Sequence, residues 1–301
     1  MSTEFFQQIC EQISSIRNNK YEVTAHSSIA GGDINRAWRL ELADTNGEVE
    51  RFFVKQNRAE LSEMFAAEAE GLAELTRNPE LRIPAVIAQG IAGDHAYLVL
   101  EYIAFAHGST ESAAQLGRGL AAQHRITAPS FGWQRDNTIG STPQPNSWTA
   151  DWIAFYRDHR LGFQLQHAQR NGASASLLRA GEKLQDALHY FFVDYSPQPS
   201  LLHGDLWGGN WGTDEHGTPV LFDPAMYYGD READLAMTEL FGGFPSDFYA
   251  AYNDAFPLDP GYRQRKDLYN LYHILNHFNL FGGGYADQAL RMTERLLAAI
   301  R

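Results

Sequence analysis

The feature that most constrains this chain is the segment HGDLWGGN (203–210), which places a carboxylate and a carboxamide in the spacing Asp205-x-x-x-x-Asn210. A short apolar run, PVLF (219–222), follows after a hairpin-like turn and leads directly into a second carboxylate, Asp223. A carboxylate can accept the proton of a hydroxyl group, and carboxamide and carboxylate oxygens are suitable Mg²⁺ ligands. One acidic residue alone is more often a turn or capping residue. The three side chains in this order indicate a phosphoryl-transfer site.

The same order occurs in the protein-kinase pattern H-R-D-x-x-x-x-N followed by D-F-G. By this pattern Asp205 is the proton acceptor, Asn210 and Asp223 are the metal ligands, and Asp223-Pro224-Ala225 stands where kinases have D-F-G. His203 is expected to organise the catalytic loop. The sequence therefore predicts an α+β, bilobal protein-kinase-like fold. It also predicts ATP and Mg²⁺ as cofactors.

A second group of residues points the same way. Lys55 lies near the end of a predicted strand, RFFVKQ (51–56), which a predicted helix follows at about 61–76. Glu68 falls in the middle of the apolar face of this helix. A carboxylate on an inward face is costly unless it is paired, so we predict an ion pair between Lys55 and Glu68, as in kinases. The alternative for Lys55 is a solvated lysine on an edge strand. The remaining glutamates are expected to be solvated on the opposite side: Glu63, Glu70 and Glu74.

A phosphate-binding loop is predicted at SIAGGDIN (28–35), directly before the strand RAWRLEL (36–42). Gly31 and Gly32 would let backbone N–H groups approach the phosphates, and Asn35 ends the loop. Two adjacent glycines are a weak motif in isolation, because kinases have a regular G-x-G-x-x-G here. The position before the strand is what supports the assignment.

The chain is predicted to divide near residue 103, into an N-terminal nucleotide-binding lobe (1–103) and a C-terminal catalytic and substrate lobe (104–301). The small lobe is expected to hold an antiparallel sheet with one key helix, and the strand HAYLVLEY (95–102) leads into the hinge. There the carbonyl of Glu101 and the amide of Ile103 are expected to contact adenine. A loop is predicted over 129–146, and long helical patterns follow at 148–171, 174–193, 230–241 and 262–280.

Composition excludes some partners. The net charge of −13 argues against binding to nucleic acid or anionic lipid, because both require a basic surface. No stretch is long and apolar enough for a membrane span, and the single cysteine, Cys10, cannot form an intramolecular disulfide. We therefore expect a soluble, cytoplasmic protein. The sequence carries no feature that defines its oligomeric state.

Four segments resemble the fructosamine kinase, or ketosamine 3-kinase, family, and the resemblance runs over essentially the whole chain. They are LLHGDLWGGNWG (201–212), LFDPAMYYGDREADLAMTELFGG (221–243), DNTIGSTPQPN (136–146) and RLGFQLQ (160–166). Aminoglycoside phosphotransferases and choline kinases share the core H-x-D-x-x-x-x-N but seldom the Leu-Trp-Gly filling.

The resemblance implies an enzyme that phosphorylates the 3-hydroxyl of ketosamines, the adducts of sugars with small amines or protein lysines. The phosphorylated adduct falls apart and releases the amine. In this sequence the resemblance implies that Asp205 accepts the hydroxyl proton and that Asn210 and Asp223 hold Mg²⁺. Lys55, fixed by Glu68, would position the phosphates.

Three further residues have two interpretations each. Asp234 resembles the aspartate that braces the catalytic loop from the following helix, or it serves the dipole of that helix. Trp207 would stack on the sugar or pack under the loop. Asn137 resembles a residue on the acceptor side of the cleft, or it builds a turn.

Two other functions remain open at this stage. One is a kinase of the same fold for another small hydroxyl compound, such as an aminoglycoside, choline or a thio-sugar, because fold alone does not fix the acceptor. The other is a catalytically silent nucleotide-binding regulator. The presence of Lys55, Glu68, Asp205, Asn210 and Asp223 argues against the silent regulator.

Overall fold

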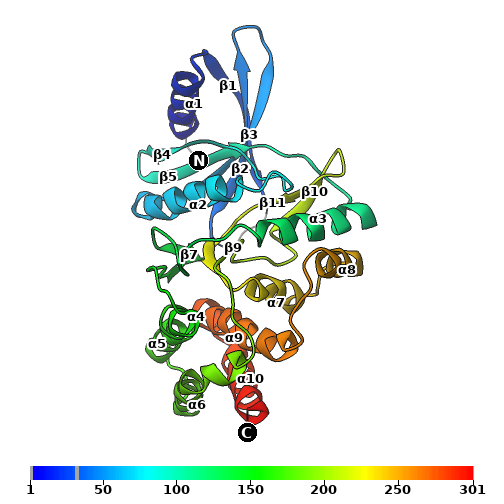
Figure 1. The fold of residues 1–301 in the computed structure, drawn as a ribbon. Helices are drawn as coiled ribbons and strands as arrows, with labels where there is room; N and C mark the ends of the chain where they lie inside the picture. The colour runs from blue at the N-terminus through cyan, green and yellow to red at the C-terminus, as the bar shows by residue number, and fades with distance from the viewer. Residues whose placement is uncertain (1–2, 31–33, 301) are drawn as a thin grey trace.

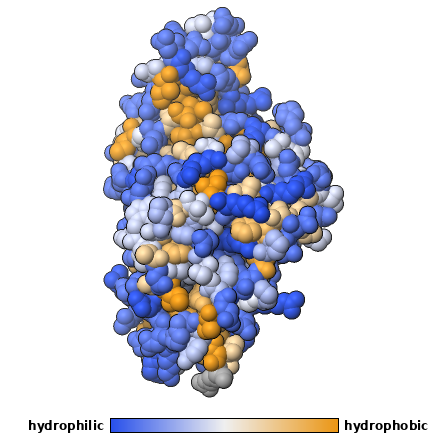
Figure 2. Space-filling view, viewed as in Figure 1, coloured by the Kyte–Doolittle hydropathy of each residue, from blue (hydrophilic) through white to orange (hydrophobic). Residues whose placement is uncertain are grey.

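The computed structural model describes residues 3–30 and 34–300. Figure 1 shows a small lobe built around a sheet and a larger, mainly helical lobe, with the two chain ends in different lobes. Most of the face in Figure 2 is hydrophilic, and its apolar residues form small patches over both lobes. In the described part of the chain no helix is long and apolar enough to cross a membrane.

The small lobe contains a five-stranded antiparallel sheet in the order β1-β2-β3-β5-β4. Its strands are β1 (Tyr21–Ile29), β2 (Arg36–Asp44), β3 (Val49–Arg58), β4 (Val86–Ala92) and β5 (His95–Glu101). The three strands predicted from sequence are confirmed as β2, β3 and β5. A turn at Asn46-Gly47 joins β2 to β3, and Gly47 adopts a φ of 81° there. The strands β1 and β4 were not predicted.

Two helices cover opposite faces of the sheet. On β5, Tyr97 and Val99 join the core under α1 (Thr3–Arg17), whereas Leu98 and Leu100 join the core under α2 (Ser62–Leu75). This division follows the two-residue period of a strand. The predicted key helix is present as α2, and the structure adds a second helix, α1, that was not predicted. The helix α1 forms because the apolar residues of TEFFQQICEQI recur on one face, which covers the side of the sheet that α2 leaves open.

The large lobe is helical, and the four long patterns predicted there are present with different limits. Its helices are α3 (Thr110–Gln123), α4 (Trp152–Tyr156), α5 (Gly162–Arg170), α6 (Ala175–Asp186), α7 (Glu232–Leu240), α8 (Ser246–Ala255), α9 (Tyr262–Phe281) and α10 (Tyr285–Ala299). The first pattern starts at Trp152 rather than 148, because the Asp151 side chain caps the helix by accepting from the Ala154 N–H. A π-helical turn, Arg157–Leu161, joins α4 to α5.

Short strands position the loops between the lobes. They are β6 (Phe105–Ala106), β7 (Asn137–Ile139), β8 (Thr142–Gln144), β9 (Ser200–Leu202), β10 (Trp211–Asp214), β11 (Pro219–Leu221) and β12 (Tyr227–Gly229). The catalytic-loop segment lies between β9 and β10, and Asp223 lies between β11 and β12. Because β9 pairs with β12 and β10 pairs with β11, both segments are held side by side. The segment predicted as a loop at 129–146 contains the β7–β8 hairpin.

Candidate active site

Asp234 on α7 holds the turn after β9 by hydrogen bonds to its backbone. The carboxylate of Asp234 accepts hydrogen bonds from the backbone N–H groups of His203 (2.7 Å) and Gly204 (2.8 Å). Burial alone would raise the pKa of Asp234, but hydrogen bonds, the foremost from His124, hold it below its ordinary value. The carboxylate is therefore ionised and fully engaged. This contact pattern agrees with the predicted bracing role.

His203 connects the catalytic loop to the segment that carries Asp223. Burial lowers the pKa of His203, so its imidazole is neutral. Its Nε2 donates to the carbonyl of Phe222 at 3.0 Å, and its Nδ1 accepts from the N–H of Asp205 at 3.3 Å. Gly204 has a φ of 83°, and a Cβ there would lie 2.0 Å from the carbonyl oxygen of Ala225. Only glycine permits this close approach.

Asp205 and Asn210 are in direct contact. The Asn210 side-chain N–H₂ donates to the backbone carbonyl of Asp205 at 2.8 Å and to its carboxylate at 3.2 Å. The same nitrogen lies 3.4 Å from the carbonyl of Asp223. These contacts orient the amide, and none of the described residues donates to its oxygen. Burial, and next the neighbouring Asp223, raise the pKa of Asp205 to about 7.

Lys55 lies between two carboxylates. Its Nζ is 2.6 Å from Glu68 and 2.6 Å from Asp223. The ion pair that helical phase predicted between Lys55 and Glu68 is therefore present. Burial would lower the pKa of Lys55, but the charges of Asp223 and Glu68 raise it above its ordinary value. Asp223 has a φ of 57°, a conformation that L-residues rarely adopt outside turns and functional sites.

The outward glutamates of α2 correct one expectation, because all three contact residues of the large lobe. Glu70 pairs with Arg135 at 2.6 Å, and the same guanidinium lies 2.8 Å from Glu63. Glu74 accepts from the Tyr228 hydroxyl at 2.5 Å. Helical phase placed these side chains on the correct side. It could not show that residues distant in sequence approach that side.

One cavity of about 690 Å³ between the lobes collects most of the predicted site residues. Those that line it are Asn35, Lys55, Glu68, Glu101, Ile103, Asn137, Asp205, Trp207, Asn210 and Asp223. His203 and Asp234 are buried behind its wall. Gly31 and Gly32 lie outside the described residues. Next to them, the Asn35 side chain accepts from the Asn57 amide at 2.8 Å, which fixes the end of the predicted phosphate loop on β3.

The predicted adenine-contact residues lie at the end of β5. The Glu101 N–H donates to the carbonyl of Ala85 at 2.8 Å, and the Glu101 carboxylate pairs with Arg82 at 2.5 Å. Glu101 and Ile103 both line the cavity. The contacts of the Glu101 carbonyl and the Ile103 amide with adenine stay a prediction.

Asn137 and Trp207 differ in the freedom of their side chains. The Asn137 amide donates to the carbonyl of Met226 at 2.7 Å and accepts from Gln144 and Asn146. These bonds fasten the β7–β8 hairpin to the segment after Asp223, and a contact of Asn137 with substrate stays a prediction. Trp207 is 40% exposed, and its ring covers Gly209, where a Cβ would lie 2.3 Å from the ring.

The structure adds a wall of the cavity that the sequence analysis did not assign. His273, Asn276, His277 and Leu280 of α9 all line it. Their spacing of i, i+3, i+4 and i+7 puts them on one helix face. The available signal was that His273, Asn276 and His277 interrupt the apolar second half of this helix. Only His203 had been given a role among the histidines.

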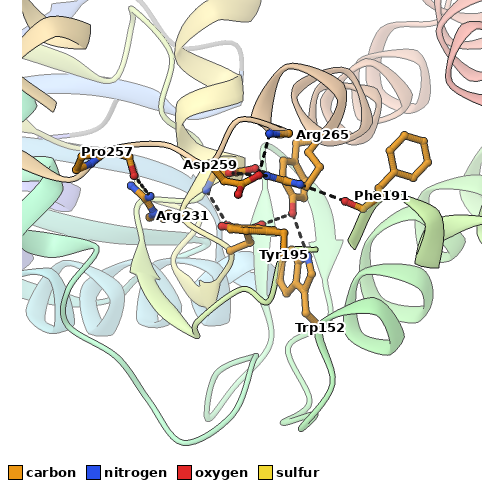
Figure 3. A network of polar contacts seen from close by, with 11 residues as sticks. Trp152, Phe191, Tyr195, Arg231, Pro257, Asp259 and Arg265 are labelled. Atoms are coloured by element: carbon orange, nitrogen blue, oxygen red, sulfur yellow. Dashed lines mark hydrogen bonds and ion pairs between the residues drawn. The ribbon is translucent and has the colours of Figure 1, made fainter. Parts of the chain in front are cut away.

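A buried polar network holds α7 and α9 together (Figure 3). Arg265 binds the Glu232 carboxylate through two nitrogens at 2.7 and 3.0 Å, and its guanidinium lies 3.8 Å from the centre of the Tyr195 ring. Asp230 accepts from Tyr195 at 2.8 Å and from Tyr269. Because Glu232 opens α7, this network fixes the helix that carries the loop-bracing carboxylate.

Comparison with known proteins agrees with this geometry. The fructosamine kinase family profile matches residues 5–299. The chain belongs to the fructosamine kinase family. A probable ketoamine kinase of Synechocystis is 47% identical over 298 residues, covering 97% of each chain. The chloroplastic protein-ribulosamine 3-kinase of Arabidopsis thaliana is 40% identical over 283 residues, covering 93% of this chain and 85% of the relative.

Solved structures place this family member among protein-kinase-like folds. A crystal structure described as a fructosamine-3-kinase candidate from Haemophilus somnus superposes with a TM-score of 0.87 at 29% identity, covering 98% of each chain. An ADP-bound aminoglycoside phosphotransferase superposes with a TM-score of 0.64 at 13% identity, covering 98% of this chain and 99% of the other. The second likeness shows the fold alone. It confirms the predicted fold class.

Proposed function

We propose that the protein is an ATP- and Mg²⁺-dependent kinase that phosphorylates the 3-hydroxyl of ketosamines, which then release their amine. The observation that carries the proposal is the convergence of Asp205, Asn210, Asp223 and Lys55 on one cavity in a chain of the fructosamine kinase family. The Arabidopsis relative, named a protein-ribulosamine 3-kinase, supports the 3-hydroxyl of a ketosamine as the acceptor.

The residues present suit Mg²⁺. The Asn210 amide oxygen and the Asp223 carboxylate supply the oxygen ligands that a hard divalent cation prefers, and phosphate oxygens complete its shell. In this structure the Lys55 ammonium lies against Asp223, so this carboxylate already binds a cationic group. Bound Mg²⁺ would neutralise charge that develops on the transferred phosphoryl group. In the described chain no group of three or more His, Cys, Asp or Glu side chains forms an alternative metal site.

Asp205 would act as the proton acceptor. A pKa of about 7 is close to physiological pH, which suits a group that accepts a proton from a hydroxyl during the reaction. The Asn210 amide fixes the orientation of the Asp205 carboxylate, and Asp234 fixes the backbone of its loop. Lys55, held by Glu68, would position the ATP phosphates. Catalysis then depends mainly on positioning and electrostatics.

ATP would bind between the lobes, against the sheet. In our proposal residues 1–103 form the nucleotide-binding lobe, and residues 104–301 form the catalytic and substrate lobe. An ADP-bound aminoglycoside phosphotransferase and an AMP-bound LicA share the fold, which supports a nucleotide at this position. The acceptor would be a free or protein-bound ketosamine. We place the enzyme in the cytoplasm, where a lone cysteine stays reduced.

The decisive test is ATP consumption with a panel of acceptors: fructosyl-lysine, ribulosyl-lysine, an aminoglycoside and choline. We expect turnover with the two ketosamines, followed by release of lysine and inorganic phosphate, both measured by mass spectrometry and phosphate assay. An Asp205→Ala enzyme serves as the blank and should bind ATP without turnover. Turnover confined to choline or the aminoglycoside would contradict the proposal.

A further inference from the structure

The α9 wall of the cavity contains a buried histidine whose polar atoms have no partner within the described chain. His273 is 5% exposed and lines the cavity that also contains Asp205. Its ring lies 5.1 Å from the ring of Tyr272, edge to face, and none of the described residues forms a hydrogen bond with either ring nitrogen. No ring nitrogen of His273 is among the fully enclosed unpaired side-chain atoms of the described chain, so the hydrogen-bonding capacity of this residue is open to the cavity and to a ligand in it.

Its neighbours on α9 are different. The Asn276 side chain already accepts from Gln164 at 3.2 Å, and the His277 Nδ1 donates to the carbonyl of His273 at 2.8 Å. The rings of Phe241 and Tyr285 lie 4.8 and 5.2 Å from the His277 ring. Asn276 and His277 therefore have protein partners. Of these three side chains, only His273 has no hydrogen-bond partner within the described residues.

The imidazole of His273 is neutral. Burial, and next the nearby His277, lower the pKa of His273 to about 3. A neutral imidazole offers one N–H donor and one nitrogen acceptor. Such a pair complements a hydroxyl group, which also donates and accepts, and it does not require a charged ligand. The apolar side chains nearby, including Met237 and Leu280, exclude water and strengthen such a bond.

We propose that His273 is an acceptor-binding residue, whose imidazole hydrogen-bonds a hydroxyl group of the sugar while the reacting hydroxyl lies at Asp205. The inference rests on the proposed function for the identity of the acceptor. It assigns the nucleotide to the small-lobe side of the cavity and the sugar to the α9 side. Polyhydroxylated acceptors would then be selected over acceptors that have a single hydroxyl, such as choline.

The test compares His273→Phe, which keeps a ring and loses both nitrogens, with His273→Gln, which keeps a donor and an acceptor. We expect His273→Phe to raise the KM for fructosyl-lysine on the order of tenfold or more, with the KM for ATP unchanged. His273→Gln should recover part of the loss.

Asn270→Leu is the matched control. Asn270 lies one turn earlier on α9, is equally buried at 5% exposure, and does not line the cavity. It should leave both KM values unchanged. If the wild type is active and His273→Phe has an unchanged KM for fructosyl-lysine, the inference about His273 is wrong and the proposed function stands. An equal rise in the ATP KM also overturns the inference about His273, since that result indicates a structural role. A wild type that uses no ketosamine contradicts the proposed function.

Discussion

At the scale of single residues, Asp205 combines a poor environment for a charge with a good position for catalysis. Its carboxylate is largely shielded from water, lies near Asp223, and among the described residues has only the Asn210 amide as a side-chain donor. Stability would favour a neutral side chain at this position. A carboxylate that is kept here at the expense of stability is expected where chemistry requires it.

This trade-off predicts a pH-dependent effect of Asp205→Asn on stability. An unfolded aspartate has a pKa of about 3.9, whereas folding raises that of Asp205 to about 7. The wild-type enzyme therefore has the full stability that protonated Asp205 allows below pH 4. It loses this stability as the pH rises from 4 through 7. Relative to wild type, the ligand-free variant should gain on the order of 4 kcal/mol between pH 4 and pH 8. Urea unfolding at both pH values measures this gain.

Other carboxylates with raised pKa values, including Glu232, are present in both proteins, so their contributions cancel in the comparison. If the stability difference between Asp205→Asn and wild type did not change with pH, folding would not raise the pKa of Asp205. The same variant should lose turnover by about 10²–10⁴-fold, as is typical when a general base is removed.

Lys55 has a structural and a chemical role, and substitutions can separate them. Lys55→Met leaves Glu68 and Asp223 without their cation, and should lower the free energy of unfolding by about 3 kcal/mol. Turnover should fall by about 10²–10³-fold. Adding Glu68→Gln should restore part of the stability but not the rate. Chemical unfolding and steady-state kinetics measure the two effects.

Lys20→Met is the control, because Lys20 is 75% exposed and pairs with exposed Glu22. It should change neither quantity measurably. If the double substitution recovered turnover together with stability, Lys55 would have no chemical role.

At the scale of elements, α2 is attached to the large lobe as well as to its own sheet. Arg135 binds its outer glutamates, and Tyr228 binds Glu74. Just beyond the helix, the Asn78 side chain donates to the backbone carbonyl of Gly119. The Leu221 N–H donates to the backbone carbonyl of Arg82. The inward Glu68 is therefore held toward Lys55 by contacts on the opposite side of the helix.

Arg135→Gln should loosen this attachment. We expect turnover to fall by about two- to fivefold with little change in global stability, because partly exposed ion pairs contribute up to about 1 kcal/mol. Hydrogen exchange should increase in α2 more than in α1. Arg118→Gln is the control, since Arg118 pairs with Glu111 on the exposed side of α3. Equal kinetics in Arg135→Gln and wild type would show that the contacts of Arg135 with α2 have no effect on Glu68.

The difference between predicted and unpredicted elements has a physical basis. The pairing of Glu68 with Lys55 could be predicted because a carboxylate on an apolar helix face requires a partner. The contact of Glu70 with Arg135 could not, because an outward carboxylate satisfied by water and one satisfied by a distant chain segment give the same pattern. Likewise the bonds of Asn137 depend on where β7–β8 packs, and local sequence does not encode that position.

At the scale of the whole molecule, the catalytic groups come from both lobes and meet only at the cavity. Lys55 and Glu68 belong to the small lobe, whereas Asp205, Asn210 and Asp223 belong to the large lobe. The motif order in the sequence predicted this bilobal arrangement, since the kinase pattern assigns each group to a lobe. The α9 wall had no corresponding motif. It became visible only in the structure, where α9 packs against α7 and lines the same cavity as the catalytic loop.

A ligand that binds groups from both lobes should stabilise the whole molecule. We expect Mg²⁺ with ATP at 100 times its Kd to stabilise the folded state by about 2.7 kcal/mol, and so to raise the melting temperature by several degrees. ATP with EDTA should give a smaller shift. In Asp223→Asn the shifts with and without Mg²⁺ should be equal, because the metal loses its carboxylate ligand. Asp94→Asn, in an exposed turn of the same lobe as Lys55, should behave as wild type. Differential scanning fluorimetry measures all four cases, and an equal Mg²⁺ effect in Asp223→Asn and wild type would exclude Asp223 as a metal ligand.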